Sequence, residues 1–97
     1  MKTRLFLFTL AAAAALATSA SAGCYADYKA KRENPLQLHY GVMQIDSDPC
    51  TMSDKVTGQV AKRLAANGWT LLKIGSVFDD SGLAKRKRDA GQYFLRF

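Results

Sequence analysis

The most regular pattern of apolar and polar positions lies in residues 52–66. Apolar side chains recur there at every fourth residue, at Met52, Val56, Val60 and Leu64. A spacing of four keeps these side chains on one face of a helix, where they form an apolar stripe that a sheet can cover. The pattern predicts an amphipathic helix over residues 52–66.

Local signals mark both ends of this helix. Thr51 and Asp54 have the spacing of a capping box at its start. Asn67-Gly68 predicts its end, because glycine adopts the left-handed backbone of the position after a helix without strain. Gly58 inside the helix costs about 1 kcal/mol relative to alanine, so we expect it to mark close packing against the sheet.

Residues 25–31 and 36–45 have the pattern of a β-hairpin, with Glu33-Asn34-Pro35 as the turn. In the second strand an apolar face alternates with a polar one, the apolar face holding Leu36, Leu38, Tyr40 and Val42 and the polar face Gln37, His39 and Gly41. The alternation breaks after Gly41, which predicts a bulge at this glycine. A short helix that ends before Pro35 is the alternative for the first segment.

The chain after the helix predicts two more strands. Residues 69–78 are rich in β-forming side chains and too short for another helix, and residues 79–82 form a turn. Residues 91–97 predict a closing strand, in which Tyr93, Leu95 and Phe97 point one way.

The predicted order is therefore ββαββ. Strands on either side of a single helix indicate an α+β fold, a two-layer domain in which an antiparallel sheet packs on one helix. The expected core combines the helix stripe with apolar strand positions, namely Tyr40, Val56, Val60, Leu64, Trp69, Leu72, Tyr93 and Leu95.

The segment Leu64-Ala65-Ala66-Asn67-Gly68-Trp69-Thr70-Leu71-Leu72 resembles a small bacterial family of unknown function. Members of that family pair a helix with a Gly-Trp-Glu-Leu turn into a strand and finish on a short aromatic strand. Thr70 stands here in place of the glutamate, and the similar region covers about half of residues 23–97. The whole chain also resembles small exported proteobacterial proteins without an assigned activity. The resemblance supports the fold and transfers no functional site.

The N-terminal segment predicts export. Lys2 and Arg4 precede an uncharged apolar run over residues 5–17, and Ala20-Ser21-Ala22 fits a signal peptidase site. The apolar run is shorter than the roughly 20 residues that span a bilayer. We therefore expect a signal peptide over residues 1–22, cleaved after Ala22, and one small domain over residues 23–97 in the periplasm or secreted, without a transmembrane segment.

Cleavage changes how charge and cysteines are interpreted. Loss of Lys2 and Arg4 lowers the formal net charge from +6 to +4, a modest excess that favours anionic partners in general. In an oxidising compartment the two cysteines, Cys24 and Cys50, are expected to form a disulfide. The alternative is a lipoprotein acylated at Cys24, although Ser21 stands where a lipobox usually has leucine.

One charge run follows the third predicted strand, at Lys85, Arg86, Lys87 and Arg88. Export removes nucleic acid as its partner. The run is then either a solvated helical turn, with basic side chains near the helix C-terminus, or a contact patch for anionic lipid head groups or an acidic protein.

Candidate catalytic and metal-binding residues are few. His39 is the only histidine and has no second ligand at metal-binding spacing, so we expect no metal site and no cofactor. Ser47 or Ser53 with His39 and an aspartate could be imagined as a catalytic set, but no motif brings them together. The aspartates fit turns better than a calcium loop.

The sequence predicts a non-enzymatic binding or accessory protein, with an unknown protein or an anionic envelope component as its partner. Two other functions stay open. One is association with the envelope surface through residues 85–88, and the other is inhibition of a periplasmic enzyme.

Overall fold

The computed structural model describes residues 23–97, and the predicted signal peptide, residues 1–22, lies outside the described residues. The elements follow in the order β1 (Cys24–Arg32), β2 (Gln37–Ile45), α2 (Asp54–Ala66), β3 (Thr70–Phe78), a 3-10 turn (Asp80–Gly82), α3 (Ala84–Ala90) and a second 3-10 turn (Gly91–Tyr93). The predicted α+β class is confirmed, with an antiparallel sheet of three strands in the order β2-β1-β3.

The hairpin of β1 and β2 is continuous, from the pair Cys24–Ile45 to the pair Arg32–Gln37. Our prediction of a bulge at Gly41 is therefore wrong. Gly41 is needed for a different reason, because the hydroxyl of Tyr28 occupies the space where a Cβ would lie. The alternation breaks after Gly41 because both faces of the sheet are covered there, and Val42 and Met43 are each 0% exposed on opposite faces.

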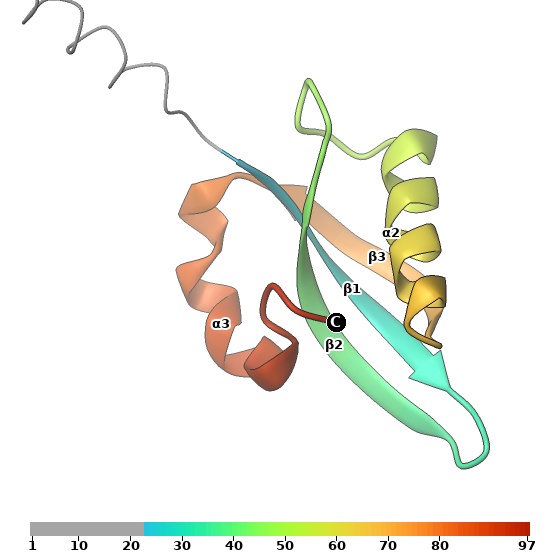
Figure 1. Ribbon diagram of the computed structural model, residues 1–97. Coiled ribbons are helices and arrows are strands. Elements are labelled where there is room, and N and C mark those ends of the chain that lie inside the picture. The colour runs from blue at the N-terminus through green and yellow to red at the C-terminus, as the bar shows by residue number, and fades with distance from the viewer. Residues whose placement is uncertain (1–22) are drawn as a thin grey trace, which may run out of the picture.

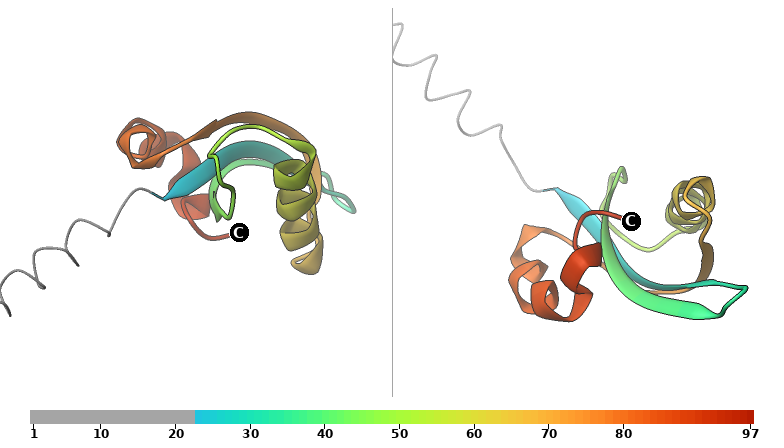
Figure 2. Two further views of the ribbon diagram at one scale, coloured as in Figure 1. Left: turned by 90° about the horizontal axis from the view of Figure 1, so that it is seen from above. Right: turned by 60° about the horizontal axis from the view of Figure 1, so that its bottom comes forward.

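The two helices lie on opposite faces of the sheet (Figures 1 and 2). On one face, the helix stripe of α2 packs on Ala26, Tyr28, Met43 and Trp69. On the other face, Ala90 of α3 packs on Tyr25 and Val42. The prediction of a sheet packed on one helix was thus incomplete, because it lacked the helix that covers the second face.

Helix α2 confirms the strongest sequence pattern. Val56, Val60 and Leu64 are each fully buried, as predicted. The N-cap is Ser53, whose hydroxyl accepts a hydrogen bond from the Val56 amide at 3.2 Å, and not the expected Thr51. Met52, expected in the stripe, precedes the helix and is 50% exposed.

The glycines of this region have contrasting roles. Gly68 ends the helix with a φ of +84°, as its position predicts. Gly58 has open space where its Cβ would lie, so our expectation of close packing was wrong.

The C-terminal segment differs most from its prediction. Instead of a strand, it forms a 3-10 turn and one parallel bridge, in which the Leu95 amide donates to the Val42 carbonyl at 2.8 Å. Tyr93 packs against the core as predicted, whereas Leu95 is 44% exposed. The segment thus pairs with the outer edge of β2 at Val42 and blocks this position from pairing with other chains.

Leu72 is the other predicted core residue that the structure leaves outside, at 49% exposed. Lys29 pairs with Lys73 and Ala30 pairs with Leu71, so the register shift between them leaves Leu72 unpaired. Leu71 and Ile74 pack toward the core instead. A bulge of this kind redirects a side chain to the other face of the strand.

A disulfide joins Cys24 at the start of β1 to Cys50 in the loop before α2, as the sequence predicts. The bond closes a loop with a sequence separation of 26 residues. A closed loop of this size stabilises a domain by about 3–4 kcal/mol in the chain-entropy account. Since the sulfur of Cys24 is bonded to Cys50, it is not available for the alternative lipid attachment.

Candidate functional site

His39 lies in an aromatic cluster on the α2 side of the sheet. The residue is only 8% exposed, so the polar face that we predicted for it is a covered face. Its Nε2 atom lies 3.0 Å from the hydroxyl of Tyr28. The ring stacks on Tyr93 with centroids 3.8 Å apart and meets the edge of Trp69 at 4.3 Å.

The cluster holds its titratable groups neutral. Burial, with a smaller contribution from the positive charge of Arg32, lowers the pKa of His39 below its ordinary 6.5. Burial also raises the pKa of Tyr28 to about 12. A neutral imidazole enclosed by three aromatic rings acts as a packing group. Arg32 completes the cluster from outside, with its guanidinium 4.0 Å from the Trp69 ring centroid.

Neither serine of the imagined catalytic set bonds to this histidine. The Ser47 hydroxyl donates to the Pro49 carbonyl at 2.7 Å, and Ser53 caps α2. The imagined set of a serine, His39 and an aspartate is therefore not assembled.

A second polar cluster, centred on Asp27, lies on the α3 side of the sheet. Asp27 accepts hydrogen bonds from Arg86 Nε at 2.9 Å, from the Tyr40 hydroxyl at 2.9 Å and from the Ser76 amide at 2.6 Å. Burial by itself raises the pKa of Asp27, but the hydrogen bonds from Arg86, Tyr40 and Ser76 outweigh it and lower the pKa below its ordinary value. The sequence carried no signal for this cluster, because its members are far apart along the chain.

Arg86 is therefore not part of an exposed basic patch. Its side chain is 17% exposed, and it also donates to the Gly82 carbonyl at 2.7 Å and to the Ser76 hydroxyl at 3.1 Å. The guanidinium lies 3.8 Å from the centroid of the Phe78 ring. The helix period explains why Arg86 differs from its three neighbours in the charge run. A helix completes a turn in about 3.6 residues, so among four consecutive residues of a surface helix at least one faces the sheet.

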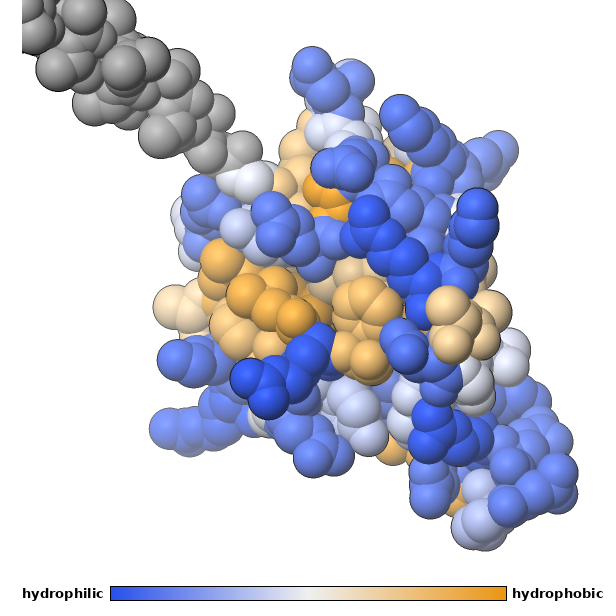
Figure 3. Space-filling view, viewed as in Figure 1, coloured by the Kyte–Doolittle hydropathy of each residue, from blue (hydrophilic) through white to orange (hydrophobic). Residues whose placement is uncertain are grey.

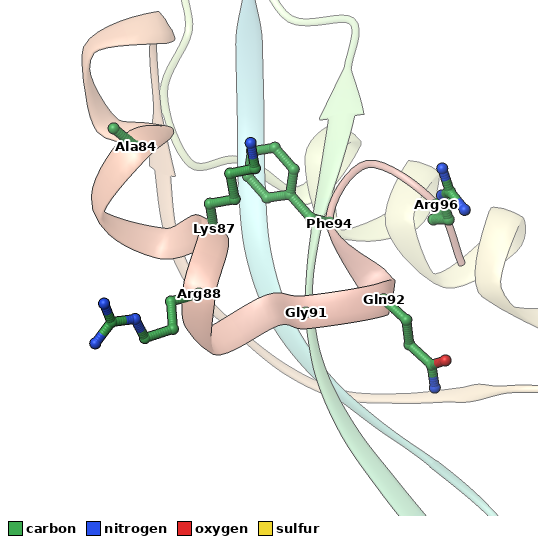
Figure 4. A pocket seen from close by; sticks show the side chains of 7 residues that line it. All are labelled: Ala84, Lys87, Arg88, Gly91, Gln92, Phe94 and Arg96. Atoms are coloured by element: carbon green, nitrogen blue, oxygen red, sulfur yellow. The ribbon is translucent and has the colours of Figure 1, made fainter.

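The other three residues of the charge run, Lys85, Lys87 and Arg88, are exposed on α3. Two of them line an open pocket of 740 Å³ between α3 and the C-terminal segment (Figure 4). The lining residues of this pocket, which we call the basic pocket, are Ala84, Lys87, Arg88, Gly91, Gln92, Phe94 and Arg96.

The basic pocket combines positive charge with one aromatic ring. In Figure 4, Lys87 and Phe94 project toward the same side, Arg96 lies beyond Phe94, and Arg88 points outward from α3. Its lining contains three cationic side chains and no carboxylate. On the face of the molecule seen in Figure 3, apolar atoms gather beside α3 and hydrophilic atoms border them. This arrangement suits an anion that also carries an apolar part.

The aspartates of the turns have structural partners. Asp79 accepts from the Ser81 amide at 3.0 Å and caps the 3-10 turn that follows. Asp46 is held at its main chain, whose amide donates to Gln59 Oε1 at 2.8 Å. Within residues 23–97, no group of three or more His, Cys, Asp or Glu side chains is placed to hold a metal ion.

Comparisons of the chain with protein-family models, with curated proteins and with solved structures find no match. In the part of the chain that the structure describes, no helix is long and apolar enough to cross a membrane.

Proposed function

We propose that this chain is an exported, non-enzymatic binding protein of the cell envelope, and that its basic pocket contacts an anionic envelope component. The observation that carries the proposal is the lining of that pocket, in which Lys87 projects toward the side of Phe94, Arg88 and Arg96 add two further positive charges, and no carboxylate is present. Clustered positive side chains attract phosphate or carboxylate groups over several ångströms.

The state of the buried polar groups supports a binding role over catalysis. The carboxylate of Asp27 is occupied by Arg86, Tyr40 and Ser76. His39 is enclosed by Tyr28 and two further rings. General acid–base chemistry needs such a group within hydrogen-bonding reach of a substrate. Asp27 instead joins the sheet to α3, and His39 packs β2 against Trp69 and Tyr93.

Export is supported by two independent features. The leader pattern of residues 1–22 predicts secretion, and the bond between Cys24 and Cys50 is of a kind that persists in oxidising compartments. An envelope location places the basic pocket near phospholipid head groups.

Sedimentation with lipid vesicles tests the proposal. The protein is expressed from residues 1–97, purified after export and mixed with vesicles of phosphatidylglycerol or of phosphatidylcholine. We expect binding to the anionic vesicles, and a loss of about fivefold in affinity for each cation removed in Lys87→Gln/Arg88→Gln. Arg86 is left unchanged in this variant because it supports the fold.

The matched control is Lys55→Gln/Lys62→Gln, which removes the same charge from exposed positions of α2. This variant should keep most of its affinity. Equal losses in the two variants would show an effect of net charge alone, and equal binding to both lipids would contradict an anionic partner.

A further inference from the structure

Helix α3 covers only one part of the sheet face that lies opposite α2. The β1–β2 hairpin extends well beyond both helices (Figure 1). On this extended part, a shallow hollow of 300 Å³ is lined by Lys29, Ala30, Leu38, His39, Tyr40 and Leu72. Lys73 lies beside it as the cross-strand partner of Lys29. We call the surface formed by Lys29, Leu38, Tyr40, Leu72 and Lys73 the open half-sheet.

The open half-sheet exposes apolar side chains that the fold does not use. Leu38 is 65% exposed and Leu72 is 49% exposed, and both line the same hollow. Leu36, at the base of the hairpin turn, is also 65% exposed. A single exposed leucine needs no explanation, but neighbouring ones at a protruding edge mark a contact surface.

The charges of the open half-sheet also favour a partner. Lys29 and Lys73 are directly paired across β1 and β3, and like charges in this position repel each other. The lining of the hollow contains no carboxylate that could relieve this repulsion. The nearby Glu33 is bonded to Lys31 at 2.6 Å, at the side of the hairpin turn. An anionic surface laid on the two lysines would remove the repulsion.

These charges also select among the possible partners. A second copy of the chain, packed face to face, would bring four lysines together and is disfavoured. A bilayer with anionic lipids offers phosphate groups to the lysines and an apolar layer directly beneath them. Leucines flanked by lysines match that order of layers.

We infer that the open half-sheet is a membrane-contact surface: Leu38 and Leu72 enter the interface of an anionic bilayer, and Lys29 and Lys73 contact its phosphate groups. The inference rests on the proposed role at an anionic envelope surface and adds a second contact, distinct from the basic pocket. The leucines contribute affinity that does not depend on salt, whereas the lysines contribute affinity that salt weakens.

Fluorescence quenching tests the insertion directly. The variant Leu38→Trp places an indole at the open half-sheet, while the native Trp69 is 5% exposed and reports the background. With phosphatidylglycerol vesicles that carry brominated acyl chains, Leu38→Trp should lose a large part of its added emission. The wild-type protein should show little quenching. No additional quenching in Leu38→Trp would overturn the inference.

Sedimentation with the same vesicles gives the second measurement. We expect Leu38→Thr/Leu72→Thr to bind about tenfold more weakly, with the loss persisting at high salt. Lys29→Gln/Lys73→Gln should lose about fivefold per lysine, and only at low salt. Threonine keeps the strand propensity, and both leucines are exposed, so the fold should persist. The control Met52→Thr removes another exposed apolar side chain and should bind normally.

The outcomes separate this inference from the proposed function. If Lys87→Gln/Arg88→Gln loses binding but the leucine variant does not, the open half-sheet is not a membrane contact and the basic pocket stands. If the leucine variant loses binding and the basic-pocket variant does not, the open half-sheet contacts the membrane and the basic pocket does not. If the wild-type protein sediments with neither vesicle, both are wrong.

Discussion

Replacement of Arg86 by methionine should strongly destabilise the domain, although the sequence places this residue in a charged surface run. Methionine keeps the length and helix propensity of the side chain but removes its charge and its donors. The change deletes the hydrogen bonds from Arg86 to Asp27, Gly82 and Ser76. It also removes the cation from the ring of Phe78.

The size of the effect follows from burial and from the bonds that remain. Loss of one partner of a fully buried ion pair costs about 3–5 kcal/mol. Here the side chains of Arg86 and Asp27 are 17% and 11% exposed, and Asp27 keeps its bonds to Tyr40 and Ser76. We therefore expect a loss of about 2–3 kcal/mol in the free energy of unfolding. A domain of this size has about 4–11 kcal/mol in total.

Urea unfolding, followed by the fluorescence of the buried Trp69, measures this loss. The control is Lys87→Met on the next residue of α3, which removes the same charge from an exposed site and should change stability by less than about 0.5 kcal/mol. Since the pKa of Asp27 is lowered in the folded state, the contribution of its carboxylate is present at neutral pH and is lost as the pH falls through the folded value. Equal stabilities of Arg86→Met and Lys87→Met would refute the structural role of the pair.

Three further substitutions test the core, the helix and the hairpin. Because burial lowers the pKa of His39, the unfolded chain binds a proton more readily, and stability should decline as the pH falls below about 6.5. His39→Gln should remove this slope between pH 7 and 5 in the same urea assay, and an unchanged slope would assign it to other groups. Gly58→Ala should raise stability by about 1 kcal/mol, since open space surrounds the site on an exposed helix face. Gly41→Ala should lower stability, because the new methyl group collides with the Tyr28 hydroxyl, and thermal melting compares the two glycine variants.

Local sequence patterns are enough to predict the parts of the fold that depend on neighbouring residues. The fourfold spacing of Val56, Val60 and Leu64 and the stop at Gly68 predict α2 because helix bonds join residues four apart. The turn at Glu33-Asn34-Pro35 predicts the hairpin because turn-forming residues separate two strand patterns. The disulfide was predictable because the predicted signal peptide indicates an oxidising compartment, where two cysteines in a small domain usually pair.

Which face of each strand is covered depends on long-range packing, which local patterns do not reveal. His39 and Gly41 looked like polar positions, but aromatic side chains cover them on the α2 side of the sheet. Leu38 on the alternate face stays exposed because α3 is too short to reach it. The C-terminal segment has the composition of a strand, yet Tyr93 packs on His39 and leaves one bridge to β2. A local sequence pattern cannot distinguish a strand of the sheet from an irregular segment that packs at the edge of the sheet.

The candidate site also has one part that the sequence predicts and another part that depends on long-range packing. The charge run was visible in the sequence, but whether its members bind a partner or support the fold depends on residues far along the chain. Arg86 meets Asp27, 59 positions away, and the basic pocket needs Arg96 and Phe94 beside α3. Helical periodicity could have indicated that one of four consecutive cations faces inward. Which of these cations faces the sheet depends on the position of the buried Asp27 carboxylate, and long-range packing alone sets that position.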